Sequence, residues 1–520
     1  MAYHIPTIFV ALAIGYTTLA AVQRITQDKK EPPSIHDAVP FISPLLAMFE
    51  KGGKFYRRLR DKYNLPIYTL RLPGTRLYII NSAPLITAVQ SQFRVLSFTA
   101  IEAALATKVF GVSKATSDIL ERNVAADEGY LMMYPKYIHA ALAAGPELDA
   151  MNRTAIQVIA DSIEERWKRG TSTVQMYRWI RREMLIASTD SVYGPKNPYR
   201  DPQMQEAWDV YERGMMKFVI GLYARLFARD SYEAREYMVT VWEKYFQNKG
   251  HEQGSAYVKA RVKINTDFQI PDDEAARMEI GGAQAVLTNT LPGTFWVVYH
   301  IFSNPAIVQD IRAELYKGVR TESDGTRVID WNFVKTSCPI LLSTFKETMR
   351  FHSSATATRF TLEDYVLDDK YLLKKGSTIM MPATVQHTDE SVWGNTVDEF
   401  LHRRFLREPG TKRINPIAFR GFGGGTTLCP GRHFASAEIL MFAALLVLRF
   451  DLHPVAGQWK TPTWVNASVI QALPEPDWDV EAELRPREDG AKWKVTFSAD
   501  NVAVDLAAED IEGATPDLGN

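Results

Sequence analysis

Hydrophobic residues recur along most of the chain at the spacing of an α-helix. Segments that predict helices are 54–63, 148–169, 177–189, 202–227, 233–247, 340–351 and 433–448, and segments that predict strands are 67–72 and 77–81. Asp201 directly before Pro202 is typical of a helix start, because its carboxylate accepts hydrogen bonds from the first free N–H groups. We therefore expect a mainly helical fold with small β-sheets.

A long apolar segment covers residues 278–302 and ends before Asn304-Pro305, which predicts a buried central helix. Pro292 has no N–H and its ring crowds the preceding turn, so we expect a kink near it. The missing hydrogen bond frees the carbonyl of Thr288, next to Asn289. We expect the kink to widen a groove that contains the free carbonyl and the Asn289 amide. This groove serves either as a cradle for dioxygen or a substrate oxygen, or the kink serves helix packing alone.

The N-terminal residues 5–22 contain no charged side chain and are just long enough to span a bilayer. Arg24, Lys29 and Lys30 follow, which predicts that the downstream chain faces the cytoplasm. A cleaved signal peptide is the alternative, but its usual positive charge before the apolar segment is missing. We expect a membrane anchor over residues 1–30, a globular domain over 31–504 and an acidic, disordered tail over 505–520.

Composition narrows the class of protein. Of the 520 residues, 46% are hydrophobic and 11% aromatic, which is sufficient for a large buried core. A net charge of −1 argues against a nucleic-acid-binding protein, which is normally strongly basic. The two cysteines make a disulfide framework implausible and favour a reducing compartment.

The most informative residue is Cys429, at the end of the segment Phe422-Gly-Gly-Gly-Thr-Thr-Leu-Cys-Pro-Gly431. Glycines allow a tight turn and a close approach to a flat ligand. The N–H groups at the start of the following helix would stabilise a thiolate and lower the pKa of the thiol. These properties suit a thiolate that serves as the axial ligand of haem iron. Cys338, in an apolar segment beside Pro339, is interpreted instead as an inert buried thiol.

The pattern Phe-x-x-Gly-x-x-x-Cys-x-Gly resembles the haem-binding signature of the cytochrome P450 superfamily. Glu347 and Arg350, three residues apart, and Arg404 match a second feature of that family, a buried Glu–Arg–Arg network behind the haem. The resemblance implies the cytochrome P450 fold and haem b (iron protoporphyrin IX) as the cofactor. The residues that it assigns to cofactor binding are Cys429 as the iron ligand, Phe422, Gly425, Gly431, and Arg359 as the partner of a haem propionate.

The chain departs from the family pattern at several positions. His402 stands where proline is usual, and Thr427 replaces an arginine or histidine that commonly contacts a propionate. Residues 285–296 of the central helix contain no acidic side chain, and Asn289 occupies the position of the usual threonine. The sequence Asn289-Thr290-x-Pro292 resembles the sterol 7α-hydroxylase and prostacyclin synthase branch and filamentous-fungal biosynthetic members. The resemblance places Asn289 and Thr290 beside the bound oxygen as catalytic residues.

The resemblance implies a monooxygenase that oxidises a small, largely apolar organic molecule, such as a secondary metabolite or a terpenoid- or steroid-like intermediate. Electrons would come from NADPH through the partner NADPH-cytochrome P450 reductase. A single-pass anchor would hold the protein in the endoplasmic reticulum membrane with its catalytic domain in the cytosol. Two further enzyme classes stay open: a haem-thiolate peroxide isomerase or dehydratase, and an enzyme of oxidative coupling without oxygen insertion. A haem-binding sensor without catalytic activity is a less favoured alternative.

Overall fold

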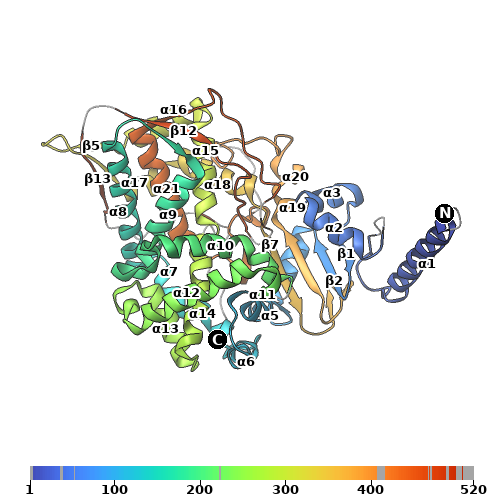
Figure 1. The fold of residues 1–520 in the computed structure, drawn as a ribbon. Coiled ribbons are helices and arrows are strands. Elements are labelled where there is room, and N and C mark those ends of the chain that lie inside the picture. Colours follow the sequence, from blue (N-terminus) through green and yellow to red (C-terminus); the bar gives the residue numbers. More distant parts are fainter. Residues whose placement is uncertain are drawn as a thin grey trace. The chain divides into compact units, whose positions relative to one another are not determined.

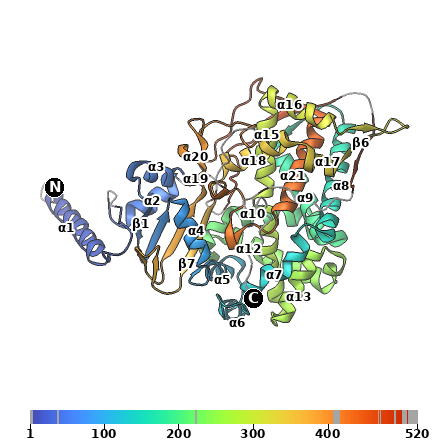
Figure 2. The same cartoon turned by 180° about the vertical axis from the view of Figure 1, so that it is seen from behind.

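A computed structural model describes residues 4–35, 39–51, 53–221, 224–406, 416–466, 468, 471–487, 491–498 and 506. The chain divides into two compact units. The smaller unit contains residues 1–101, 354–397 and 414–427, and the larger contains 102–353, 398–413 and 428–520. Figures 1 and 2 show the elements of both units from opposite sides.

The smaller unit is built around a five-stranded sheet of order β1-β2-β10-β7-β3. Its strands are β1 (Ile67–Leu72), β2 (Thr75–Ile80), β10 (Thr378–Pro382), β7 (Thr356–Thr361) and β3 (Leu96–Ser97). Strand β1 pairs antiparallel with β2, with Ile67 opposite Ile80, whereas β10 pairs parallel with β2. A separate hairpin joins β8 (Tyr365–Leu367) and β9 (Tyr371–Leu373). Both strands that the sequence predicted near the N-terminus are therefore present, within two residues of the expected bounds.

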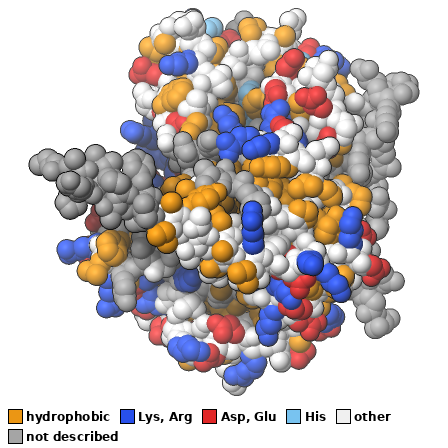
Figure 3. All heavy atoms as spheres, turned by 90° about the vertical axis from the view of Figure 1, so that its right-hand side faces the viewer, with side chains coloured by type: hydrophobic (Ala, Val, Ile, Leu, Met, Phe, Trp, Pro, Cys, Tyr) orange, Lys and Arg blue, Asp and Glu red, His pale blue; other side chains and the backbone are white. Residues whose placement is uncertain are grey.

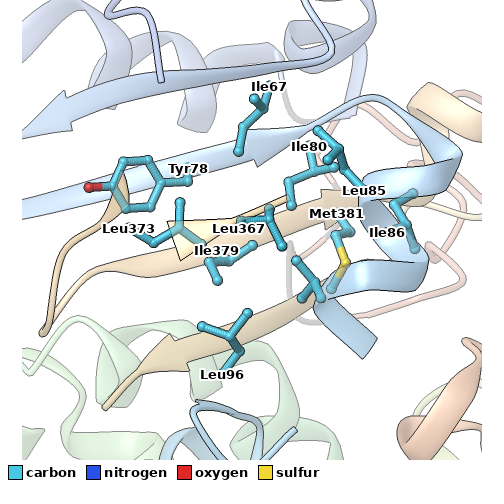
Figure 4. Packing of buried hydrophobic residues seen from close by; sticks show 11 residues of the cluster. Ile67, Tyr78, Ile80, Leu85, Ile86, Leu96, Leu367, Leu373, Ile379 and Met381 are labelled. Atoms are coloured by element: carbon cyan, nitrogen blue, oxygen red, sulfur yellow. The ribbon is translucent and has the colours of Figure 1, made fainter. Parts of the chain in front are cut away.

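Helices cover both faces of this sheet. On one face, Leu85, Ile86 and Val89 of α4 (Ala83–Ser91) pack with Ile67, Tyr78, Ile80, Ile379 and Met381, as Figure 4 shows. On the other, Phe55, Tyr56 and Leu59 of α3 (Gly53–Tyr63) pack with Tyr68, Leu70 and Ile79. The alternation follows from the period of two along a strand, which sends successive side chains to opposite faces. The remaining helices assigned in this unit are α1 (His4–Ile25), α2 (Ile42–Lys51), α19 (Ala383–His387) and α20 (Glu390–Trp393).

The larger unit is mainly helical. Its α-helices are α5 (Thr99–Leu105, which begins in the smaller unit), α6 (Lys114–Glu121), α7 (Tyr130–Leu142), α8 (Pro146–Lys168), α9 (Met176–Tyr193), α10 (Pro202–Val219), α11 (Ala224–Phe227), α12 (Arg229–Gln247), α13 (Ala256–Asp267), α14 (Asp272–Leu287), α15 (Thr290–Phe302), α16 (Pro305–Tyr316), α17 (Trp331–Ser337), α18 (Pro339–His352) and α21 (Arg432–Arg449). Helix α8 packs against α9 and α21, and α15 packs against α9, α18 and α21. Helix α21 is buried along almost its whole length, so it forms the centre of this core.

Two three-stranded sheets complete the larger unit. One has the order β11 (Phe450–Pro454), β12 (Glu481–Pro486) and β4 (Ser172–Gln175), and its strands are antiparallel. The other has the order β13 (Trp493–Thr496), β6 (Arg327–Asp330) and β5 (Arg320–Thr321). The prediction of a mainly helical fold with small sheets is therefore correct.

Two predicted helices are interrupted in the structure. The segment 202–227 contains α10 and the short α11, and the Asp201 side chain caps α10 by accepting a hydrogen bond from the N–H of Gln203. The segment 278–302 is divided between α14 and α15, which end and begin at Leu287 and Thr290. The interruption next to Asn289 agrees with the kink expected from Pro292.

The prediction of a membrane-spanning helix is not supported by the described residues. Helix α1 covers the expected segment, but among the parts of the chain that the structure describes no helix is both long and apolar enough to cross a membrane. The side chains of residues 1–12, which include residues 5–12 of the predicted span, lie outside the described residues. The predicted acidic tail also lies outside them, except for residue 506.

Hydrophobic, basic and acidic side chains are interspersed on the molecular face in Figure 3, as expected for a chain with a net charge of −1.

The candidate functional site

Cys429 lies in the turn that leads into α21, and Gly431 is the residue directly before that helix. The N–H of Gly431 is directed at the Cys429 thiol and acts to lower its pKa, as does the charge of Arg432. Cys429 thus sits at the N-terminal end of an 18-residue helix, where the partial positive charge of free N–H groups favours an anion. This local geometry suits a sulfur that carries negative charge.

The expectation of a lowered thiol pKa is nevertheless wrong for the protein without its metal. Burial raises the pKa of Cys429, and the opposing effects of the Gly431 N–H and the Arg432 charge are smaller. The physical reason is that desolvation disfavours the charged form of a thiol. A bound metal cation reverses this balance, because a coordinating thiol is deprotonated outright.

In the smaller unit, two glycines of the loop before Cys429 have left-handed backbone conformations, with φ of +81° at Gly423 and +59° at Gly425. A Cβ atom at Gly425 would lie 2.9 Å from the side chain of Gln90. A larger residue at this position would therefore be strained by its backbone and by its neighbour. Phe422, which directly precedes these glycines, belongs to the same unit.

Arg359 of β7 is fully buried and is held by the same loop. Its Nη2 donates to the hydroxyl of Thr427 at 2.8 Å, and its Nη1 donates to the carbonyl of Thr358 at 2.7 Å. Thr427 stands where the family commonly has a basic residue, and the sequence indicated only a lost propionate contact there. The structure shows instead that Thr427 orients the arginine that is expected to bind a propionate.

The predicted Glu–Arg–Arg network is present in the larger unit. Glu347 of α18 is fully buried and accepts two hydrogen bonds from Arg350, each of 2.8 Å. Arg404 donates to both carboxylate oxygens of Glu347 at 3.0 and 3.1 Å, and the N–H of Leu401 adds a further bond at 3.0 Å. Both guanidinium groups also bind the carbonyl of Glu399. One carboxylate therefore joins the end of α18 to residues 399–404.

His402, where the family usually has proline, has a contact of its own. Its Nε2 lies 2.8 Å from Oδ2 of Asp310 on α16, and Arg403 binds the same oxygen at 2.7 Å. This ion pair fastens the segment to α16 without a proline. The arginine at position 404 therefore reaches Glu347 despite the departure from the family pattern.

The break between α14 and α15 contains Thr288 and Asn289. The amide oxygen of Asn289 accepts hydrogen bonds from the N–H groups of Ala472 and Leu473, at 2.8 and 3.2 Å. Pro292 lies in the first turn of α15, where its missing N–H is least costly. Thus the Asn289 side chain ties the broken helix to residues 472–473, a packing contact that the sequence did not indicate.

Thr290 is the first residue of α15 and is buried, and its carbonyl accepts a hydrogen bond from the Thr294 hydroxyl at 2.8 Å. Five residues before Thr290, Ala285 is exposed, although Ala283 and Leu287 on the same helix are fully buried. The small side chain of Ala285 leaves room at this surface for a large flat ligand. The roles of Asn289 and Thr290 next to bound oxygen stay predictions.

The donor set fits haem. In the larger unit the half-buried thiol of Cys429 at a helix N-terminus suits the iron, and in the smaller unit the fully buried guanidinium of Arg359 suits a carboxylate such as a propionate. Gly425, before the cysteine, has no room for a Cβ atom beside Gln90. Gly431, after the cysteine, directly precedes α21.

The sequence did not indicate a buried pair of histidines, His300 on α15 and His352 on α18, which contact each other between these helices. His300 and His352 approach to 2.7 Å between their Nε2 atoms. His352 stacks on Trp296 with ring centroids 3.9 Å apart, and His300 stacks on Phe400 at 3.7 Å. The only signal in the sequence was the position of His352 two residues after Arg350.

Comparisons with known proteins agree with these observations. The family model described as Cytochrome P450 matches residues 33–476. "Cytochrome P450 monooxygenase nodJ" of Hypoxylon pulicicidum is 35% identical over 93% of this chain and 95% of its own length. "Cholesterol 7-alpha-monooxygenase" of Cricetulus griseus is 22% identical over 88% of this chain and 93% of its own length.

The solved structure of "Retinoic acid bound cyanobacterial CYP120A1" has the same fold. It superposes with a TM-score of 0.68 at 19% identity and covers 88% of this chain and 99% of its own. The predicted resemblance, including the sterol hydroxylase branch, is confirmed. This chain belongs to the cytochrome P450 family, whose cofactor is haem, and it is a cytochrome P450 monooxygenase.

Proposed function

We propose that this monooxygenase oxidises a small, largely apolar organic molecule, a secondary metabolite or a terpenoid- or steroid-like intermediate. Cys429, with the N–H of Gly431 directed at its sulfur, is the observation that carries the haem-thiolate assignment. The substrate class is supported by the relative from Cricetulus griseus, whose name gives cholesterol, an apolar steroid, as its substrate.

Haem b with a thiolate ligand supplies the activation of dioxygen. In the net reaction one oxygen atom enters a C–H bond of the substrate and the other leaves as water, which consumes two electrons and two protons. Cys429 would hold the iron and Arg359 a propionate. Glu347, Arg350 and Arg404 would keep the segments behind the haem in place. The electrons would come from NADPH through NADPH-cytochrome P450 reductase.

The test is a carbon monoxide difference spectrum, recorded after reduction with dithionite and again with NADPH and purified reductase as the only electron source. We expect the strongly red-shifted Soret band of a thiolate-ligated carbonyl haem under both conditions, and its loss in Cys429→Ser. Cys338→Ser is the matched control and should keep the band. Folded protein that binds haem but lacks the band would contradict Cys429 as the iron ligand.

A peroxide isomerase or dehydratase is the second candidate, and the absence of an acidic residue from residues 285–296 favours it. Such an enzyme needs neither electrons nor protons from outside. The band would then form with dithionite but not with the reductase, and turnover of an organic hydroperoxide would proceed without NADPH. Oxidative coupling would instead consume NADPH and dioxygen without placing labelled oxygen in the product.

We further propose that residues 1–30 anchor the protein in the endoplasmic reticulum membrane, with the catalytic domain in the cytosol. The uncharged segment 5–22 and the basic residues Arg24, Lys29 and Lys30 support this location. The full chain should stay in the membrane fraction after washing with alkaline carbonate, whereas a chain lacking residues 1–30 should be released. Release of both chains would contradict the anchor.

A further inference from the structure

A buried cluster of polar groups lies in the larger unit, where α9 packs against both α14 and α15. At its centre, the guanidinium of Arg181 on α9 contacts three carboxylates. Its Nη2 binds Asp209 and lies 2.9 Å from Oε2 of Glu212, and its Nη1 lies 3.6 Å from Oε1 of Glu475. Asp209 and Glu212 belong to α10, and Glu475 follows the segment that Asn289 binds.

The three carboxylates differ greatly in their access to solvent. The exposed fractions of the side chains are 40% for Asp209, 32% for Glu475 and 6% for Glu212. One guanidinium cannot neutralise three carboxylates, so one of them is favoured to hold a proton. Burial raises the pKa of Glu212 and the negative charge of Glu475 raises it further, while Arg181 opposes both. Among the three, Glu212 is therefore the carboxyl whose protonated form burial favours most.

No second cation acts on Glu212 among the described residues. The other titratable groups that face it are the hydroxyls of Tyr177 on α9, Tyr199 before α10, and Tyr211 on α10 itself. Burial raises the pKa of each of these tyrosines, so they are neutral in the physiological range. They offer hydroxyl dipoles rather than charge.

The Thr288 hydroxyl faces the Glu212 carboxyl. It acts to lower the pKa of Glu212, against the effect of burial, and within the described part of the chain neither Thr288 Oγ1 nor Glu212 Oε1 has another hydrogen-bond partner. Both atoms are shielded from solvent, as is the hydroxyl of Tyr177.

This cluster ends at the break in the central helix. Thr288 directly precedes Asn289, and Pro292 leaves the Thr288 carbonyl without its helical N–H partner. The acidic residue that the central helix of most family members carries is absent from residues 285–296. Glu212, on α10, therefore places a carboxyl group beside Thr288 at the break between α14 and α15.

We propose that Glu212 is the proton donor of the oxygen-activating site and that it acts through the hydroxyl of Thr288. This inference rests on the proposed monooxygenase function. The O–H bond of the Glu212 carboxyl breaks and its proton passes to Thr288 Oγ1, while the hydroxyl proton of Thr288 is taken up by the oxygen of dioxygen as NADPH-derived electrons reduce it. Arg181 stabilises the resulting carboxylate, which takes its next proton from solvent on the side of the partly exposed Asp209.

The test uses dioxygen itself as the probe, since reduction by NADPH and reductase without an organic substrate also consumes protons: one dioxygen, two electrons and two protons give hydrogen peroxide. In the haem-loaded enzyme, Glu212→Gln should lower this NADPH oxidation by about 10²-fold, the usual effect of a proton donor. The rate should lose its dependence on pH and gain a larger solvent deuterium isotope effect. Glu206→Gln, an exposed position on the same helix, is the control and should keep the wild-type rate.

Two further measurements distinguish a relay from a structural role. Thr288→Val should lower the rate as Glu212→Gln does, whereas Thr288→Ser, which keeps the hydroxyl, should restore it. Infrared difference spectra between wild type and Glu212→Gln at neutral pH should show the carbonyl stretch of one protonated carboxyl in the wild type, independently of turnover. Glu438 on α21 is a second buried acid with a raised pKa. It is present in both proteins, so its carbonyl stretch cancels from the difference spectrum.

The outcomes also separate this inference from the proposed function. A wild-type enzyme without the thiolate carbonyl band would overturn the function and the inference together. A normal band, with Glu212→Gln at the wild-type rate and an unchanged pH profile, would overturn the inference alone. An equal loss of rate in both Thr288 variants would contradict the relay through the hydroxyl.

Discussion

At the scale of single residues, the hydrogen bond between Thr427 and Arg359 explains a departure from the family's haem-binding pattern. Thr427 departs from the family pattern, yet its hydroxyl holds the Arg359 guanidinium at 2.8 Å. A threonine cannot contact a propionate by charge, but it fixes the arginine that can. The sequence suggested that position 427 had lost a propionate contact. In the structure this position instead holds the arginine that is expected to make such a contact.

Glu438 on α21 is fully buried, and within the described part of the chain only its Oε2 is hydrogen-bonded, accepting from the hydroxyl of Ser188 at 2.9 Å. Burial raises the pKa of Glu438 well above its ordinary value, so the folded protein keeps this acid neutral. The unfolded chain ionises it above its ordinary pKa of 4.5. Stability from this group is thus full below that pH and is lost as pH rises toward the folded pKa.

We expect Glu438→Gln to be more stable than wild type at neutral pH, with an advantage that grows between pH 5 and pH 8. Thermal unfolding at several pH values measures the difference. Glu165→Gln, an exposed position on α8, should show no such trend. A constant difference across this pH range would contradict a neutral Glu438.

At the scale of elements, single side chains decide how helices are fastened to loops. Asn289 holds the break between α14 and α15 against residues 472–473. Removing its amide oxygen leaves two part-buried N–H groups without their acceptor, at a cost of about 1–3 kcal/mol each.

Asn289→Ala should therefore lower the unfolding free energy by about 2–6 kcal/mol and raise hydrogen exchange at the N–H groups of Ala472 and Leu473. Asn289→Asp keeps an acceptor oxygen and should preserve their protection. Equal exchange in both variants would show that the amide oxygen is not the fastening group.

The link between α18 and residues 399–404 depends on Glu347 in the same way. Removing its charge breaks the ion pairs that two buried guanidinium groups make with Glu347, which costs about 3–5 kcal/mol. We expect Glu347→Ala to reduce the yield of folded protein and to lower its unfolding temperature strongly.

The matched control is Arg403→Ala. Its side chain is 52% exposed and pairs with Asp310, so its loss should cost no more than about 1 kcal/mol. Chemical denaturation of both variants gives the two values. Similar costs for Glu347→Ala and Arg403→Ala would contradict a structural role for the buried network.

At the scale of the whole molecule, the pH dependence of stability reflects groups that are far apart in the sequence. His300 and His352 are both buried and neutral. Burial lowers the pKa of His300 to about 3, and burial, together with the neighbouring His300 ring and the charge of Arg350, places the pKa of His352 well below its ordinary 6.5. The unfolded chain takes up protons at these residues below pH 6.5, so stability present above that pH is lost as pH falls.

Each histidine should reduce the unfolding free energy by about 1.4 kcal/mol per pH unit, or about 2 kcal/mol between pH 6.5 and pH 5. Denaturant titrations over this range should show a shallower loss in the double variant His300→Gln/His352→Gln than in wild type. His139→Gln, an exposed position on α7, should keep the wild-type slope. Equal slopes in all three proteins would show that the pair is not buried as neutral histidine.

Several features were predictable from the sequence because they depend on neighbours along the chain. The start of α10 at Asp201-Pro202, the break before Pro292 and the strands at 67–72 follow from local backbone chemistry. Glu347 and Arg350 share one helix face, so their pairing also follows from their spacing. Their union with Arg404 required the resemblance to a known family.

The sequence by itself determined that Cys429 stands at the start of a buried helix, because a glycine-rich turn and an apolar segment are local signals. Only the tertiary structure decided which polar groups share the interior: the amide oxygen of Asn289 with residues 472–473, His300 with His352, and Glu212 with Thr288. Each of these contacts joins residues from different elements. Their energies depend on burial and on the charges nearby, and the linear order of residues does not encode either quantity.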